Sequence, residues 1–219
     1  MDQTLQPQLA SELLAKQELI RATKGFMPPD EGAALAAALK GCDVSMDLPA
    51  VEIGSYTGLS TIYLGTAAQL QGRLLLSVDH HHGSQENQAG WEYHDPSLID
   101  PVSGKMDTLY LFRRAMELAG LDDTVIIVVA NSQSFAATFC TEIGFLFIDG
   151  GHGHDQAYSD YDSWVPKLAE SGVLAIHDVF ADPSLGGQAP YHLYQRSLGE
   201  GFQEIGAQGS LRVMRKGSA

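Results

Sequence analysis

The stretch "AVEIGSYTGLSTIYLG", residues 50–65, has the pattern of a buried strand, a glycine-bearing loop and a helix in succession. Ala50 to Ile53 are apolar apart from Glu52, as expected for a strand that is covered on both faces. Gly54 and Gly58 bracket a short polar loop, and a helical pattern follows it. Since a strand, a glycine loop and a helix in this order bind cofactors in α/β proteins, we predict a cofactor loop here.

Short apolar runs alternate with helical patterns along the rest of the chain. Strands are expected in "RLLLSVD" (73–79), "TVIIVVA" (124–130), "GFLFID" (144–149), "GVLAIHD" (172–178), "FQEIGA" (202–207) and "SLRVMRK" (210–216). Helices are expected at residues 8–23, 30–41, 59–70, 106–119, 134–140, 155–168 and 191–198. Continuous apolar strands indicate a parallel sheet with helices on both faces. We therefore predict one α/β domain over residues 1–219. Its doubly wound sheet has about seven strands, mostly parallel, with a C-terminal antiparallel hairpin.

Polar residues follow these strands, at the point where each one ends. They form the groups 54–57, 79–82, 131–133, 149–154 and 177–178. In a doubly wound sheet, ligands bind at the carboxyl ends of the strands, near the point where the strand order reverses. The sequence therefore predicts a single site built from these groups.

The cofactor loop does not fit a dinucleotide. A dinucleotide loop needs a glycine where the backbone approaches the pyrophosphate, and this chain has Tyr56 there. Glu52 would repel phosphate and would suit a positively charged ligand. Asp79 closes the second strand, where an acid commonly binds the two ribose hydroxyls. An adenosine with a cationic tail and without phosphates describes S-adenosylmethionine.

The order of these motifs resembles that of class I S-adenosylmethionine-dependent methyltransferases, whose fold is Rossmann-like. The nearest members are small-molecule O-methyltransferases of the catechol, caffeoyl-coenzyme A and macrolide-sugar types. The resemblance rests on "VEIGSYTGLS", "SVDHHHG", "VVANSQSF" and the segment from "FLFIDGGHGHD" to "GVLAIHDV". In addition, "GFMPPDEGAALAAAL" resembles the segment that covers the cofactor, so residues 1–45 are expected to form a helical cap over it.

The resemblance implies the cofactor-binding residues position by position. Glu52 and Gly54 would lie by the methionine end, Asp79 would hold the ribose, and Ser132 with Gln133 would border the adenine. The full expected set is Glu52, Gly54, Ser55, Tyr56, Gly58, Ser60, Asp79, His80, Ser132, Gln133 and Asp149.

Two groups of residues after the fourth and fifth strands could activate a hydroxyl acceptor. Aligned with metal-dependent relatives, Asp149, His177 and Asp178 would hold a divalent cation such as magnesium or manganese. The imidazole of His177 departs from the usual oxygen ligands. Either it shifts the preference towards manganese, iron or zinc, or the cation is absent and His177 and Asp178 act by themselves. His152 falls where catechol-type enzymes carry a catalytic lysine, and it could act as the general base beside Asp149. The alternative is that these residues have only structural roles.

The segment His80 to Lys105 is too long for a simple connection and has no clear periodicity. Long irregular loops in compact domains are commonly functional. We predict that it covers the acceptor pocket, with Trp91, Tyr93 and His94 as candidates to contact the acceptor.

The composition of the chain limits the classes of molecule that it is expected to bind. The formal net charge is −14, from 27 acidic and 13 basic residues, which disfavours nucleic acid and anionic membranes. The N-terminus lacks the apolar core of a signal peptide, so a cytoplasmic location is expected, and a homodimer is expected from symmetry statistics. The leading hypothesis is O-methylation of a small hydroxylated metabolite. A methyltransferase that acts on nitrogen would use the same cofactor loop, but it would need neither a cation nor a strong base. The alternatives are a metal-dependent hydroxylase or hydrolase using Asp149, His152, His177 and Asp178, and an NAD-dependent oxidoreductase.

Overall fold

The apolar runs form a seven-stranded sheet in the computed structural model of the chain, which describes residues 5–91, 93–151 and 153–217. The strands are β1 (Ala50–Ile53), β2 (Leu75–Asp79), β3 (Val125–Val129), β4 (Ile143–Ile148), β5 (Leu168–Ile176), β6 (Gln203–Gln208) and β7 (Leu211–Arg215). The α-helices are α1 (Leu5–Ala15), α2 (Gln17–Ala22), α3 (Pro29–Lys40), α4 (Leu59–Gln71), α5 (Leu109–Ala119), α6 (Ser132–Thr138), α7 (His154–Trp164) and α8 (Ala189–Gly199). Every strand that the sequence predicts is present, so the predicted fold class is confirmed.

The strand order is β3-β2-β1-β4-β5-β7-β6. The pairs from β3 to β5 are parallel, whereas β7 is antiparallel to both β5 and β6, as the predicted hairpin requires. The chain adds β2 and β3 on one side of β1 and then crosses to add β4 and β5 on the other. The order therefore reverses between β1 and β4, and their carboxyl ends border the crevice where such sheets bind ligands.

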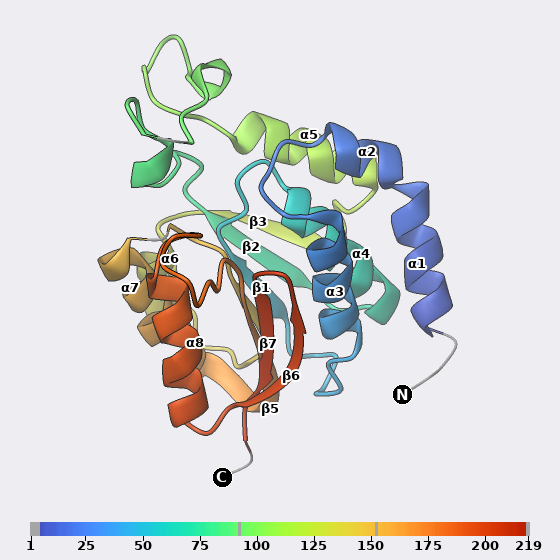
Figure 1. Cartoon of the computed structure of the whole chain (residues 1–219). Helices are drawn as coiled ribbons and strands as arrows, with labels where there is room; N and C mark the ends of the chain where they lie inside the picture. The colour runs from blue at the N-terminus through green and yellow to red at the C-terminus, as the bar shows by residue number, and fades with distance from the viewer. Residues whose placement is uncertain (1–4, 92, 152, 218–219) are drawn as a thin grey trace.

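Helices cover both faces of the sheet (Figure 1). One apolar cluster joins α1, α3, α4 and α5 to residues such as Ala50, Leu75 and Phe145. The other joins α6, α7 and α8 to the alternate strand residues, such as Val51 and Leu76. This burial on both faces explains why the strands are continuous apolar runs in the sequence.

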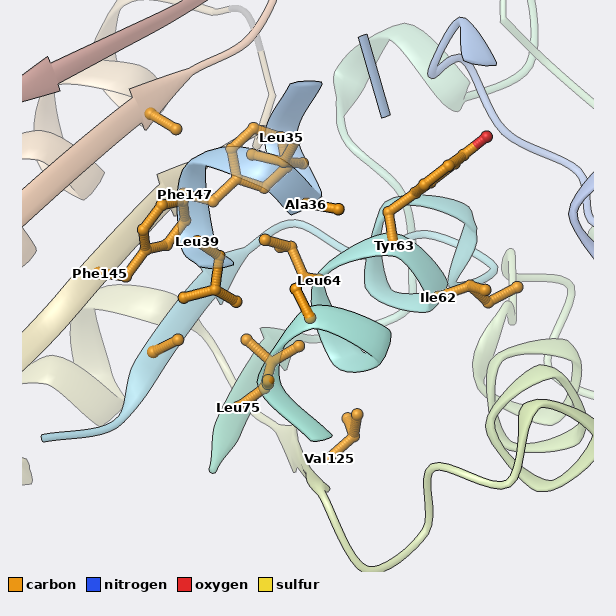
Figure 2. Packing of buried hydrophobic residues seen from close by; sticks show 14 of the residues in the cluster. Leu35, Ala36, Leu39, Ile62, Tyr63, Leu64, Leu75, Val125, Phe145 and Phe147 are labelled. Atoms are coloured by element: carbon orange, nitrogen blue, oxygen red, sulfur yellow. The ribbon is translucent and has the colours of Figure 1, made fainter. Parts of the chain in front are cut away.

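Helix α3 brings the N-terminal segment onto the sheet. Leu35 and Leu39 of α3 lie between Leu64 of α4 and the rings of Phe145 and Phe147 on β4 (Figure 2). These five side chains are completely buried. Their burial fixes the start of α3 near the carboxyl ends of β4 and β5, where the site lies.

Several helix boundaries differ from the prediction, and α5, for example, begins at Leu109 instead of residue 106. The first helix is divided at Lys16 into α1 and α2. Helix α6 begins at Ser132 because the side chain of Asn131 accepts a hydrogen bond from the amide of Ser134 at 3.0 Å and caps the helix. Helix α7 ends at Trp164, and a 3₁₀ turn with Pro166 follows it. Among the described residues, no helix has the length and apolar character needed to cross a bilayer.

Candidate functional site

A cavity of about 930 Å³ opens at the carboxyl ends of β1, β2 and β4. The segment Lys24 to Met27, the connection after β2 and the connections after β4 and β5 complete its wall. Of the residues predicted for the site, those that line it are Gly54, Ser55, Tyr56, Ser60, Asp79, His80, Trp91, Tyr93, Ser132, Asp149 and Asp178. Residues from separate strands thus meet in one cavity, as the strand-end rule predicts.

The loop after β1 follows a backbone path that needs glycine. Gly54 has φ 84°, and a Cβ atom there would overlap the carbonyl group of Asp149 at the end of β4. Gly58 has φ 98°, and a Cβ atom there would press on Phe112 and Met116 of α5. Gly58 therefore serves packing beside α5, whereas Gly54 lets β1 and β4 approach each other at the cavity.

Asp79 holds this loop in place. Its carboxylate accepts hydrogen bonds from the backbone amides of Ser55 at 2.9 Å, Tyr56 at 3.0 Å and His81 at 2.7 Å. Tyr56 has φ 49°, a left-handed conformation that is unusual for a residue with a side chain. Because a carboxylate has about four acceptor positions, one remains for a ligand in the cavity. The acid expected to hold the ribose therefore also shapes the cofactor loop.

Glu52 lies outside the cavity lining and is completely buried. Its carboxylate accepts hydrogen bonds from Ser60 at 2.6 Å, Thr61 at 2.6 Å and Ser77 at 2.8 Å. Burial raises the pKa of Glu52 to about 7, although the three hydroxyl donors lower it. Glu52 was expected to contact the cofactor directly, but it reaches the cavity through Ser60, which does line it.

The three predicted metal ligands converge. One ligand atom each of Asp149, His177 and Asp178 lies within 4.8 Å of the others. Nδ1 of His177 is 3.2 Å from Oδ1 of Asp149 and 3.3 Å from Oδ2 of Asp178. Asp178 has φ 55°, and this left-handed turn lets consecutive side chains point to the same place.

The imidazole of His177 has a third acidic neighbour, Glu31 of α3. Nε2 of His177 is 2.8 Å from Oε2 of Glu31, and both side chains are buried. Burial opposes the charged imidazole, but the nearby Asp149 and Asp178 outweigh it and raise the pKa of His177 to about 11. The ring therefore carries a proton on each nitrogen at neutral pH when the site holds no cation.

The part of the cavity near Ser132 contains a buried acid, Asp160 of α7. Gln133 donates to it at 2.9 Å and Gln156 at 3.0 Å, and burial raises its pKa. Gln133 therefore points to Asp160 and lies outside the lining, whereas Ser132 lines the cavity and accepts a hydrogen bond from Nε1 of Trp164 at 2.9 Å.

Aromatic side chains form the outer wall. Trp91 and Tyr93 line the cavity, and the ring of Phe26 lies 5.1 Å from Tyr93 and 5.5 Å from Tyr56. His94 lies outside the lining, with Nδ1 3.1 Å from the carbonyl oxygen of Asn87.

A salt bridge ties the N-terminal segment to the connection after β2. Nζ of Lys24 lies 2.5 Å from Oδ2 of Asp95. His152 lies outside the residues that the structure describes, while its neighbours Gly151 and Gly153 line the cavity.

Glu31, Asp160 and Phe26 were not named among the predicted site residues, although Phe26 and Glu31 belong to the segment expected to cover the cofactor. An acid in the first turn of a helix, such as Glu31, is ordinarily explained by the helix dipole, so nothing in the sequence singled out Glu31 within that segment. The sequence did contain a signal for Asp160, because this acid lies on the apolar face of α7 with Ala157 and Trp164.

A family model described as a methyltransferase domain matches residues 51–179. Among solved structures, the O-methyltransferase NovP superposes with a TM-score of 0.64 at 15% identity, covering 86% of this chain and 80% of that chain. An O-methyltransferase from Bacillus cereus in complex with SAH has a TM-score of 0.61 at 16% identity, covering 94% and 91%. TomG from Streptomyces achromogenes, an O-methyltransferase in complex with SAM, has a TM-score of 0.56 at 16% identity, covering 95% and 89%. At these identities the likeness shows a shared fold.

Proposed function

The chain belongs to the methyltransferase-domain family that matches residues 51–179, and we propose that it transfers a methyl group from S-adenosylmethionine to a hydroxyl of a small molecule. The observation that carries the proposal is the shared cavity. The loop held by Asp79 and the acids Asp149 and Asp178 line the same cavity, so cofactor and acceptor positions adjoin. The family match favours methyl transfer over the metal-dependent hydroxylase or hydrolase and over the NAD-dependent oxidoreductase.

The cavity suits the cofactor in size and charge. Its volume of about 930 Å³ is in the range of small-molecule sites. Asp79 and Asp149 make the wall acidic, which suits a sulfonium and an ammonium group better than a phosphate. Bound S-adenosylmethionine supplies a methyl group on a positively charged sulfur, a carbon already activated for displacement. The chain contributes alignment: Gly54 lets the loop after β1 lie close to the end of β4 at the cavity, and Asp79 offers the ribose an acceptor.

A divalent cation fits Asp149, His177 and Asp178. Two carboxylates and one imidazole, with ligand atoms within 4.8 Å of one another, are a donor set that suits manganese, iron or zinc. A cation held there would act as a Lewis acid and lower the pKa of the acceptor hydroxyl. We keep His152 as the proposed base that takes the hydroxyl proton, since the glycines on both sides of it line the cavity.

The acceptor is proposed to enter beside Trp91, Tyr93 and Phe26, whose exposed rings form the outer wall. An aromatic wall offers stacking to a planar acceptor and apolar contact to any other.

The predicted homodimer is part of the proposal and would be tested by light scattering.

A thermal-shift experiment tests the cofactor first. S-adenosylhomocysteine (SAH) at about one hundred times its dissociation constant should stabilise the protein by roughly 2.7 kcal/mol. This corresponds to a rise of roughly 5 to 10 °C in Tm. NAD is the control ligand and should leave Tm unchanged. A rise with NAD and none with SAH would refute the proposal.

Methyl transfer is then followed with isotopically labelled S-adenosylmethionine and a panel of phenols, alcohols and amines, with and without a chelator. Asp149→Asn should abolish transfer. The matched control is Asp123→Asn, an exposed acid that precedes β3 at the opposite edge of the sheet. Labelling of amines alone, insensitive to the chelator, would replace O-methylation by N-methylation.

A further inference from the structure

We propose that Glu31 is a positioning residue for the cation site: its carboxylate holds the Nε2–H of His177, so that Nδ1 faces Asp149 and Asp178 as a ligand. The inference rests on the proposed cation site. It adds a residue from the N-terminal helical segment to that site, and it gives the segment a role beyond covering the cavity.

The contacts of Glu31 are those of a fixed acceptor. Its carboxylate accepts hydrogen bonds from Nε2 of His177 at 2.8 Å, from the amide of Ser210 at 3.0 Å and from the hydroxyl of Ser210 at 2.9 Å. Only 6% of Glu31 is exposed. A buried carboxylate is costly unless donors surround it, so this arrangement strongly favours one orientation of the side chain.

Glycine at position 209 makes room for this arrangement. A Cβ atom on Gly209, in the turn between β6 and β7, would overlap the carboxylate of Glu31. The turn also supplies both Ser210 donors. Helix α3, the β6–β7 turn and the end of β5 therefore meet at one carboxylate.

The orientation of the ring decides which nitrogen can bind a cation. An imidazole can rotate about its χ2 torsion in two broad positions, so a free ring would present either nitrogen. With Nε2 held by Glu31, the other nitrogen lies 3.2 Å from Asp149 and 3.3 Å from Asp178. Metal-binding histidines commonly donate their second N–H to a carboxylate, which fixes the tautomer and makes the ligand more basic.

The net charge around His177 is a second reason to assign Glu31 to the cation site. Three carboxylates surround one imidazole, so the group has a charge of about −2 even when the ring is protonated, from three negative charges and one positive charge. All four side chains are at least three-quarters buried. A divalent cation would offset this charge, and Glu31 contributes to the attraction without occupying a ligand position.

The test is Mn²⁺ binding to metal-stripped protein, measured by calorimetry, with Co²⁺ absorption as a report on the nitrogen ligand. Glu31→Gln should lower Mn²⁺ affinity by about 10- to 100-fold and change the Co²⁺ spectrum. Asp30→Asn is the matched control, because Asp30 also links α3 to β6, accepting from Gln208 at 2.7 Å, but contacts no proposed ligand. It should bind both ions as the unaltered protein does.

Equal Mn²⁺ affinity and an unchanged Co²⁺ spectrum in Glu31→Gln would overturn the inference. Absence of binding by the unaltered protein would overturn it together with the cation site, whereas SAH binding would still decide the methyltransferase proposal separately. If Glu31→Gln does not fold, Ser210→Ala replaces it, since it removes one donor to Glu31 and keeps every charge. Its Mn²⁺ affinity should fall below that of Asp30→Asn, and equal values would refute the role of Glu31.

Discussion

Replacing Glu52 by glutamine should change the pH dependence of stability. Glu52 lies on β1, completely buried, with three hydroxyl donors from Ser60, Thr61 and Ser77 around its carboxylate. Burial raises its pKa from an ordinary 4.5 to about 7. A glutamine has nearly the same shape and can bond to the same hydroxyls, but it has no charge to bury.

The direction of the pKa change decides whether the free energy of unfolding rises or falls with pH. The folded protein binds the proton of Glu52 more tightly than the unfolded chain, so the stability gained from this proton is complete below pH 4.5 and is lost as the pH rises to about 7. At roughly 1.4 kcal/mol for each pKa unit, the loss is about 3 kcal/mol. Glu52→Gln does not undergo this loss, so the difference in free energy of unfolding (variant minus unaltered protein) should rise by about 3 kcal/mol over this pH range.

Urea unfolding at several pH values between 4.5 and 8 measures the effect. The quantity to compare is the difference in free energy of unfolding between Glu52→Gln and the unaltered protein, because every other titrating group cancels in it. Glu170→Gln, the same substitution at an exposed position of β5, is the matched control. A difference for Glu52→Gln that stays flat, or falls with rising pH, would refute the burial argument.

Three further changes have expected outcomes. Gly54→Ala should lower the free energy of unfolding by roughly 1 to 3 kcal/mol and remove the SAH thermal shift, since φ is 84° and a Cβ atom overlaps the end of β4; a variant that binds SAH normally would contradict this. Mn²⁺ binding at pH 7.5 should release about one proton, because His177 has a pKa of about 11 and must lose a proton to become a ligand. Calorimetry in buffers of different ionisation enthalpy would show this, and enthalpies that do not vary with the buffer would oppose it. Lys24→Met breaks the pair with Asp95 and should cost under about 1 kcal/mol in urea unfolding, yet raise KM for the acceptor. A large loss of stability would instead make the pair structural.

Much of the fold was predictable because local patterns and strand topology agree. Each apolar run became a strand, and the prediction of a class I methyltransferase is confirmed by the family match and the strand order. The boundaries that moved did so for local reasons, such as the cap from Asn131 at the start of α6. The site was predictable to the extent that it follows strand ends, which is why Asp79, Asp149 and Asp178 all line the cavity.

The chain's amino-acid order alone determined the order of strands and helices, the glycine loop after β1 and the polar residues at the strand ends. These features depend on hydrophobic periodicity and on backbone conformations that glycine tolerates, and both can be read from near neighbours in the chain.

Tertiary structure decided what those residues touch. Glu52 became a buried acid because β1 is central in the sheet, and Gln133 turned to Asp160 because α6 packs on α7. Glu31 met His177 across 146 positions of sequence because Leu35 and Leu39 seat α3 on the sheet. Such contacts depend on how two faces pack together, and no periodicity along a single strand or helix specifies its partner.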